Sequence, residues 1–318
     1  MPMILCCLTV EALNIISSDI ASSSVTSRRQ FALHLPAITA AVSTAISTNT
    51  PQAYAEESAT TSSHSSSIAE RLESDILRAP SITAGVKPTG HENLYFPPWL
   101  EGEWDATQTL IDTKAPLGLK YVGGPQGSLE IAQKTLAEQA KRVNEPVNLK
   151  LRFVNTNFGV VEDRAFNLKQ RLDSFAGKQV VASVEYADVR ESNRASILAA
   201  GGKESDPLST TLVYFKGPAA QKTFVISHGQ DSLESDEWAG YELDRSIFAL
   251  TNQSTAPPVT TDQEAIYSFK RVGNDKVEGR LRLVGYLNPQ ADTLYFETKN
   301  RGVSITDYTL SLRARESS

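Results

Sequence analysis

The feature that most constrains the fold is a period-two alternation of apolar and polar residues, which recurs from about residue 100 to the end of the chain. Successive side chains of a β-strand point to opposite faces, so alternation is typical of strands with one buried face. In the run 148–153, for example, Leu149, Leu151 and Phe153 alternate with polar residues. Turn-forming residues such as Asn288 and Pro289 separate the runs. The pattern predicts antiparallel strands joined by short turns.

About ten such runs are present, and a sheet of that many short strands has exposed edges unless it closes on itself. We therefore predict a mainly β protein whose antiparallel strands form a barrel. Apolar residues at helical spacing interrupt the pattern at 128–143, and a further turn of helix is expected at 168–175. The barrel should thus carry one or two inserted helices.

The two ends of this region resemble a particular barrel. Gly102 and Trp104 open the first strand, and Arg313 lies in the last. Lipocalin-like barrels begin with Gly-x-Trp, and an arginine from the last strand stacks on that indole. A guanidinium covers an aromatic face favourably. The resemblance implies that Trp104 and Arg313 close one end of a lipocalin-like β-barrel.

A wider resemblance covers most of residues 94–315. Its segments are Trp-Leu-Glu-Gly-Glu-Trp at 99–104, Ala-Pro-Leu-Gly-Leu-Lys-Tyr-Val at 115–122, Val-Val-Glu-Asp-Arg-Ala-Phe-Asn at 160–167 and Asp-Tyr-Thr-Leu-Ser-Leu-Arg at 307–313. As a set they resemble an uncharacterised family of cyanobacterial and plastid proteins, known only as a domain of unknown function. The resemblance implies a thylakoid-associated, lipocalin-like β-barrel, and it implies no activity.

The N-terminal region resembles an export signal. Arg28 and Arg29 precede a mild apolar stretch, and the small residues Ala53 and Ala55 stand at the −3 and −1 positions of a cleavage site. Residues 1–27 lie in front of this twin-arginine signal and suggest a two-step address, into a plastid and then into the thylakoid lumen. They fit either a transit peptide or a secretory-type signal. We expect residues 1–55 to be a disordered targeting leader that is cut after Ala55.

The rest of the chain divides in two by composition. Residues 56–90 form a polar linker with a short amphipathic helix at 68–78, in which Ile68, Leu72 and Ile76 share one face. A helix resting on the barrel is the simpler interpretation, and peripheral membrane contact is the alternative. Residues 91–318 form the barrel domain.

Charge and cysteine content exclude several function classes. The net charge of −6 makes nucleic acid a poor partner. Both cysteines lie in the leader, so the remaining chain has no thiolate nucleophile and no cysteine metal ligand. Its histidines are His64, His91 and His228, which provide no two-histidine metal site. We expect neither a metal nor a cofactor, and the sequence has no phosphate loop, dinucleotide fingerprint or nucleophile elbow.

Candidate binding residues are polar side chains that share a strand face with apolar ones. If Val160 and Phe166 point inward, parity places Glu162 and Arg164 inward as well. By the same argument Arg245 lies with Tyr241. His228 lies with Phe224 and Ile226.

These residues allow two interpretations. In the first, Glu162, Arg164 and Arg245 form an internal charge network that Glu242 or Asp244 balances near a rim. In the second, they face a ligand. In the second case Glu162, Arg164, His228, Tyr241 and Arg245 line a cavity for a small amphipathic or anionic hydrophobic molecule, such as a pigment, quinone or lipid.

The function we predict is therefore a non-catalytic, lumenal binding protein that supports the photosynthetic membrane. The first alternative is a ligand-free interaction or assembly factor for photosynthetic complexes, acting through its outer surface and the helix at 68–78. The second is an acid/base isomerase or lyase that uses His228 or Glu162 inside the barrel.

Overall fold

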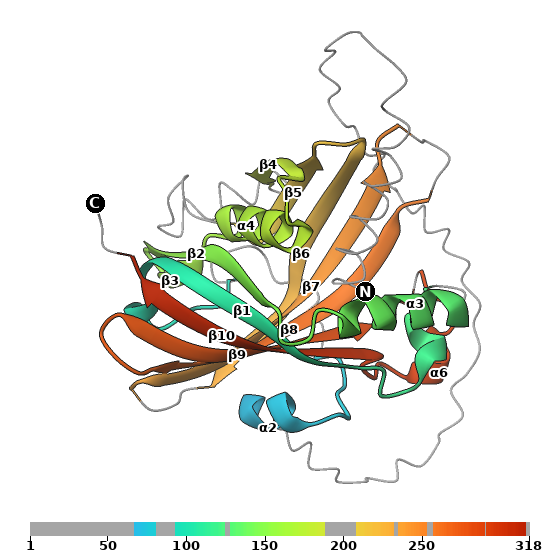
Figure 1. Cartoon of the computed structure of the whole chain (residues 1–318), viewed down its shortest axis with the longest axis horizontal. Helices are drawn as coiled ribbons and strands as arrows, with labels where there is room; N and C mark the ends of the chain where they lie inside the picture. The colour runs from blue at the N-terminus through green and yellow to red at the C-terminus, as the bar shows by residue number, and fades with distance from the viewer. Residues whose placement is uncertain are drawn as a thin grey trace, which may run out of the picture.

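In the computed structural model, ten antiparallel strands form a single sheet that curls into a half-barrel (Figure 1). The structure describes residues 67–80, 93–124, 128–187, 208–231, 235–252, 257–289 and 291–315. The strands are β1 (Gly102–Lys114), β2 (Pro146–Thr156), β3 (Gly159–Glu162), β4 (Val181–Tyr186), β5 (Thr210–Phe215), β6 (Ala219–Asp231), β7 (Glu237–Leu250), β8 (Val259–Arg271), β9 (Lys276–Tyr286) and β10 (Ser304–Ala314). The predicted mainly β architecture of about ten antiparallel strands is confirmed.

The strand order is β3-β2-β1-β10-β9-β8-β7-β6-β5-β4. Strands β4 to β10 follow one another as a meander, and β10 then pairs with β1, so that Trp104 lies opposite Ala314. Within the described residues the edge strands β3 and β4 do not pair with each other. The sheet is therefore a half-barrel with two edges, where the sequence predicted a closed barrel.

Four α-helices and two short 3-10 helices accompany the sheet in the described residues. They are α2 (Ile68–Glu73), η1 (Pro98–Leu100), η2 (Leu119–Val122), α3 (Leu129–Ala140), α4 (Arg164–Ala176) and α6 (Tyr295–Thr298). None of the helices in this part of the chain is both long and apolar enough to span a bilayer.

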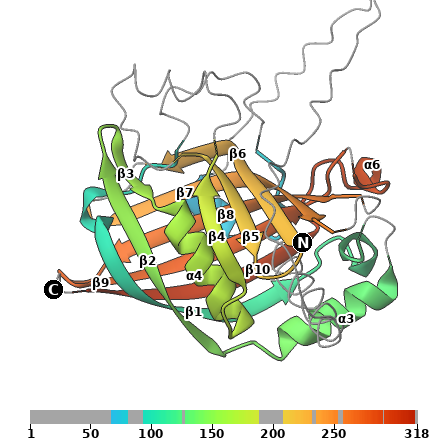
Figure 2. The same ribbon diagram turned by 90° about the horizontal axis from the view of Figure 1, so that it is seen from above.

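Helix α4 lies between the two edges of the sheet, beside β2 and β3 on one side and β4 on the other (Figures 1 and 2). It satisfies edge groups on both sides. The side chain of Asn167 bonds the backbone of Arg152 in β2. Asp173 Oδ1 accepts from the backbone N–H groups of Val180 and Val181, at 2.7 and 2.9 Å. The helix therefore bridges the gap that strand pairing leaves open.

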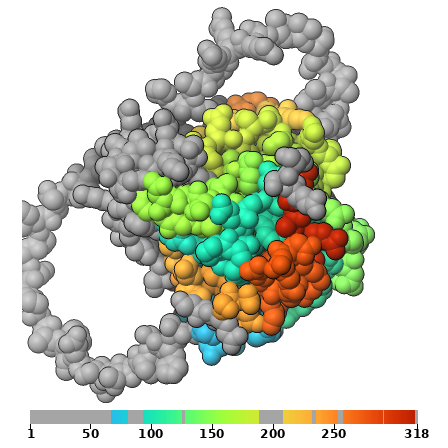
Figure 3. Space-filling model, turned by 90° about the vertical axis from the view of Figure 1, so that its left-hand side faces the viewer, coloured from blue at the N-terminus to red at the C-terminus, as the bar shows by residue number. Residues whose placement is uncertain are grey.

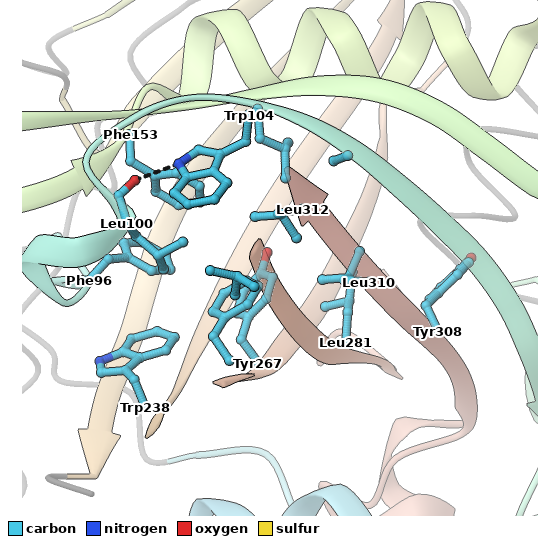
Figure 4. Packing of buried hydrophobic residues seen from close by; sticks show 14 of the residues in the cluster. Phe96, Leu100, Trp104, Phe153, Trp238, Tyr267, Leu281, Tyr308, Leu310 and Leu312 are labelled. Atoms are coloured by element: carbon cyan, nitrogen blue, oxygen red, sulfur yellow. Dashed lines mark hydrogen bonds between the residues drawn. The ribbon is translucent and has the colours of Figure 1, made fainter. Parts of the chain in front are cut away.

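The concave face of the sheet holds the main core. Its buried residues include Trp104, Phe153, Trp238 and Tyr267, which pack with leucines of β9 and β10 (Figure 4). The indole Nε1 of Trp104 donates to the carbonyl of Leu100 at 2.8 Å. Residues 93–104 cover this end of the half-barrel, next to the β2–β3 hairpin and the β8–β9 turn (Figure 3).

Residues 67–80, the first described segment of the chain, cover the convex face, and we call them the strap. Ile68, Leu72 and Leu77 of the strap pack on a second apolar cluster that includes Leu243 and Ile266. The predicted helix 68–78 is shorter than expected. It ends at Glu73, after which Ser74 is extended, so Ile76 is 79% exposed and Leu77 takes the buried position.

The other helices follow the expected pattern with different bounds. The predicted helix 128–143 is α3, and the expected turn 168–175 is the longer helix α4. The targeting leader, including Arg28, Arg29, Ala53 and Ala55, lies outside the described residues. Its assignment stays a prediction.

Candidate functional site

Five charged side chains gather on the concave side of the half-barrel beneath α4. Glu162 ends β3, Arg164 and Arg171 come from α4, and Glu242 and Asp244 come from β7. The two β7 residues share the face of Trp238, a member of the concave core, because side chains two residues apart lie on one face. We call Glu162, Arg164, Arg171, Glu242 and Asp244 the interior cluster.

The starting residue of α4 determines that both arginines face the interior of the half-barrel. Asp163 caps the helix, and its Oδ1 accepts from Phe166 N at 3.2 Å. From that start, Arg164 and Arg171 lie about two turns apart on one helical face. That face carries Leu168 and Phe175 as well, which pack against buried apolar residues.

The arginines pair with two of the three carboxylates. Arg164 Nη2 bonds Glu242 Oε2, and so joins α4 to β7 across the interior. Arg171 Nη1 lies 2.5 Å from Glu162 Oε1, which also accepts from Asn167 Nδ2 at 3.0 Å. Breaking one buried pair of this kind leaves the partner charge uncompensated, at a cost of about 3–5 kcal/mol.

Burial and ion pairing shift the pKa values of the three acids of the interior cluster in different directions. Burial favours the protonated form of Glu162, but Arg171 and Arg164 outweigh it, so its pKa is lowered. Burial raises the pKa of Glu242. The pKa of Asp244 is raised well above its usual range by burial and by the neighbouring Glu242. The two guanidiniums thus pair with two carboxylates, and Asp244, which has no such pair, is the acid whose protonated form burial favours most.

Two buried polar atoms of the interior cluster make no hydrogen bond within the described residues. They are Arg164 Nε, a donor, and Asp244 Oδ1. Asp244 and Arg164 interact electrostatically, and the carboxyl contributes to the raised pKa of the guanidinium. An unpaired buried polar group costs about 1–3 kcal/mol, so a site that keeps two of them is suited to a hydrogen-bonding occupant.

Three of the five predicted binding residues lie on the concave side. Glu162 and Arg164 do so, although Arg164 comes from a helix and the strand parity used to place it ends at Glu162. Phe166 does not point inward, because its ring lies under the Arg152 guanidinium at 4.2 Å, on the outer side of β2. His228 is in register with Glu242 and so shares its face.

His228 does not lie with Phe224 as predicted. A β-bulge between Val225 and Ser227 shifts the register, so Phe224 is opposite Arg245 while His228 is opposite Glu242. One extra residue in a strand moves all later side chains to the other face.

Arg245 and Tyr241 share a face, as parity predicted, but it is the convex face. Arg245 is paired with Asp262, through Nε to Oδ1 at 2.7 Å and Nη2 to Oδ2 at 2.8 Å. Tyr241 lies beneath the strap, with the Arg71 guanidinium 5.8 Å from its ring centre. Both residues are therefore separated by the sheet from Glu162, Arg164 and His228.

Trp104 and Arg313 also lie on opposite faces. Trp104 is in register with Ala314, whereas Arg313 is opposite Asp105. Arg313 instead lines an open polar groove of about 560 Å³ between α4 and the outer side of β1 and β2. The expected stacking of Arg313 on the indole is not formed, and the Leu100 carbonyl anchors Trp104 in its place.

Comparison with known proteins places the chain in a family. A model described as a domain of unknown function, DUF6816, matches residues 88–316. The chain belongs to the DUF6816 family. No curated protein and no solved structure matches the chain. The half-barrel thus corresponds to the DUF6816 domain, and the strap at 67–80 precedes the matched region.

Sequence reasoning missed Arg171 of the DUF6816 domain and placed Glu242 and Asp244 near a rim. Helical spacing was the available signal for Arg171, because Arg164, Leu168, Arg171 and Phe175 repeat at intervals of three or four residues. For the two acids, alternation with Trp238 along 238–244 was the signal.

Proposed function

We propose that the half-barrel interior binds a small amphipathic molecule, and that the interior cluster recognises an oxygen atom of that molecule. The observation that carries this proposal is the pair of unpartnered buried atoms, Arg164 Nε and Asp244 Oδ1. The guanidinium N–H is a donor, and the carboxyl group of Asp244 is a second donor in its protonated form, which burial favours. Together they suit one acceptor oxygen. The apolar concave residues supply surroundings for the rest of the molecule.

Charge balance narrows the chemistry of the ligand. Arg164 and Arg171 already pair with Glu242 and Glu162, and the raised pKa of Asp244 favours its neutral form. A carboxylate or phosphate headgroup would find no unpaired cation in the interior cluster. Its burial as an uncompensated charge would be unfavourable. A neutral carbonyl or hydroxyl oxygen fits better. Of the classes considered from the sequence, a quinone or a carbonyl-bearing pigment meets this requirement, and an anionic lipid does not.

The proposed role is that of a carrier without catalysis. Its setting, the thylakoid lumen of a cyanobacterial or plastid membrane system, is part of the proposal and depends on the leader pattern at residues 28–55. Expression of the full chain in a photosynthetic host tests the location. Fractionation should recover a lumenal form that begins at Glu56, and replacing Arg28 and Arg29 by lysine should abolish it.

Ligand binding is tested on the protein purified from the same host without denaturation. An organic extract of the denatured protein, analysed by mass spectrometry, should contain one neutral oxygen-bearing hydrophobic compound in stoichiometric amount. Arg164→Lys keeps a cation for Glu242 but removes the Nε–H donor, so we expect at least a tenfold loss of bound compound, or about 1.4 kcal/mol. Arg171→Lys makes the same change about two turns further along the same face of α4 and serves as the matched control.

An extract without any stoichiometric compound, from a folded protein, would overturn the proposal. The two polar atoms would then be satisfied by water, and the interior cluster would serve to fasten α4 to β7. That result would favour the assembly-factor alternative. Equal loading of the two lysine variants would remove Arg164 from the site.

A further inference from the structure

A cleft of about 260 Å³ lies on the convex side of the sheet, where the strap meets the segment that follows β9. It is separated by the sheet from the interior cluster. The strap forms one wall with Ala79 and Pro80. The other lining residues come from β7, β8 and residues 286–300: Leu243, Arg245, Asp262, Tyr286, Leu287, Pro289, Tyr295 and Asn300.

Arg245 is the polar feature of this cleft, and it is held in one orientation. Asp262 takes its Nε and Nη2 groups in a two-pronged contact. Asn288 Nδ2 in turn donates to both oxygens of Asp262 at 3.2 Å. The hydrogen bonds of Arg245 within the described residues leave its Nη1 group unused, and the side chain is 19% exposed. A fixed guanidinium with unused N–H groups is a ready donor for a ligand oxygen.

The remaining walls are mostly apolar. Leu243, Leu287 and Pro289 contribute carbon surface, and the Tyr286 hydroxyl is already committed to Glu264 Oε2 at 2.6 Å. The hydroxyl of Tyr295 bonds Asn300 Oδ1. The two tyrosines therefore offer the cleft aromatic surface rather than free hydroxyl groups, which favours a flat apolar molecule.

The charges around the cleft disfavour an anion. Asp262 neutralises Arg245, and Asp292 adds a further carboxyl group close to Asp262. A second acid beside one paired guanidinium makes the region neutral to negative. The acceptor that fits Arg245 is therefore a neutral oxygen, as in a ketone.

We propose that this cleft is a second binding site, for a small planar apolar molecule whose neutral oxygen accepts a hydrogen bond from Arg245. The strap is part of the site. Ala79 N donates to Asn300 O at 2.9 Å, and Gly302 N donates to Leu77 O at 2.8 Å, which fixes the strap wall against the α6 segment. Because the strap precedes the region matched by the family model, this chain completes the cleft with residues outside its DUF6816 domain.

The test compares two probes of the same shape, 1-indanone and indane, which differ by the carbonyl oxygen. Titration of the full chain, followed by protein NMR, should show saturable binding of indanone at millimolar concentration and binding at least tenfold weaker for indane. Hydrogen exchange at the Ala79 and Gly302 amides should slow when indanone is bound and stay unchanged with indane.

The variant arm uses Arg245→Lys, which keeps a cation for Asp262 but removes the planar fork. We expect it to weaken indanone binding at least tenfold. Arg280→Lys makes the same exchange on the same face, away from the cleft, and should bind as the parent does. Arg164→Lys should also leave indanone binding unchanged, which separates this site from the interior one.

Equal binding of indanone and indane would overturn the role of Arg245, and so would equal binding by the Arg245→Lys and Arg280→Lys variants. If Arg245→Lys unfolds, the probe comparison and the exchange rates of the parent protein still decide. An absence of saturable indanone binding, with no change in exchange at Ala79, rejects the site.

Discussion

The side-chain amide of Asn167 binds the backbone of Arg152 as a neighbouring strand would. Its Oδ1 accepts from Arg152 N at 2.7 Å, and its Nδ2 donates to Arg152 O at 3.1 Å. Asn167 is fully buried on α4, while Arg152 lies on β2 beyond the reach of the short strand β3. This contact explains how a helix can stand in for a strand at the edge of a sheet.

Asn167→Ala should destabilise the fold by about 1–3 kcal/mol, because Arg152 N and the buried Glu162 carboxylate each lose a hydrogen bond. The loss is not larger, since Arg152 O keeps a bond from Asp163 N at 3.0 Å. Chemical denaturation measures the difference. Asn148→Ala on β2, the strand of Arg152, is the matched control: its side chain bonds Thr107 at an exposed position, and we expect a change within about 0.5 kcal/mol. Equal effects of the two substitutions would refute the edge-sealing role.

The strap depends on one buried ion pair. Arg71 bonds Glu264, whose side chain is fully buried, at 2.6 Å. Arg71→Ala should leave that carboxylate without its cation, at a cost of about 3–5 kcal/mol, unless the strap detaches and lets water in. We expect detachment, seen as rapid proteolysis within residues 67–80.

The control for this prediction is Arg280→Ala, which removes an exposed pair with Glu73 on the same strap. Exposed pairs contribute about 0–1 kcal/mol, so cleavage of the strap should stay close to the parent rate. Similar cleavage of the two variants would show that the apolar contacts of Ile68, Leu72 and Leu77 hold the strap without the buried pair.

Gly229 allows Tyr241 to lie flat on the convex face. A Cβ at Gly229 would stand 2.6 Å from the Tyr241 ring. Gly229→Ala should therefore displace the ring and destabilise the protein by about 1–3 kcal/mol. Gly229→Ala combined with Tyr241→Ala should recover most of the loss that Gly229→Ala adds. Additive losses in the double variant would show that the two positions do not interact.

The sequence predicts those parts of the fold that local periodicity controls. Alternation correctly buries Leu149, Leu151 and Phe153, and helical spacing locates α3 and α4. It fails at single residues that change the period. The Asp163 cap turns Arg164 from a strand position into a helical one, and the bulge at Val225–Ser227 moves His228 to the other face.

The candidate site was only partly predictable for a related reason. Parity states which residues share a face, but it does not state which face is concave. Arg245 and Tyr241 were grouped correctly, yet they lie under the strap because Leu243 and Ile266 make the convex face apolar too. When both faces of a sheet are buried, alternation carries no sign of inside and outside.

The raised pKa of Asp244 predicts an unusual pH dependence of stability. Its pKa is raised in the folded protein, so between its unfolded pKa of about 3.9 and its folded pKa the folded state binds more protons than the unfolded state. The contribution of Asp244 to stability is therefore fully present below about pH 3.9 and is lost as the pH rises through this window, by at most about 1.4 kcal/mol per pH unit.

Asp244→Asn mimics the protonated acid and removes this loss. The free energy of unfolding of the variant minus that of the parent should therefore increase as the pH rises above about 4, and it should be constant below that. Glu162 acts in the opposite direction, since its lowered pKa makes the parent lose stability as the pH falls, but this term is common to both proteins and cancels in the difference. Denaturation of both proteins across this pH range measures the difference directly. A difference that does not change with pH would mean that Asp244 is ionised in the folded protein. Asp244 would then be an acceptor beside Arg164, and the proposed site would lack its second donor.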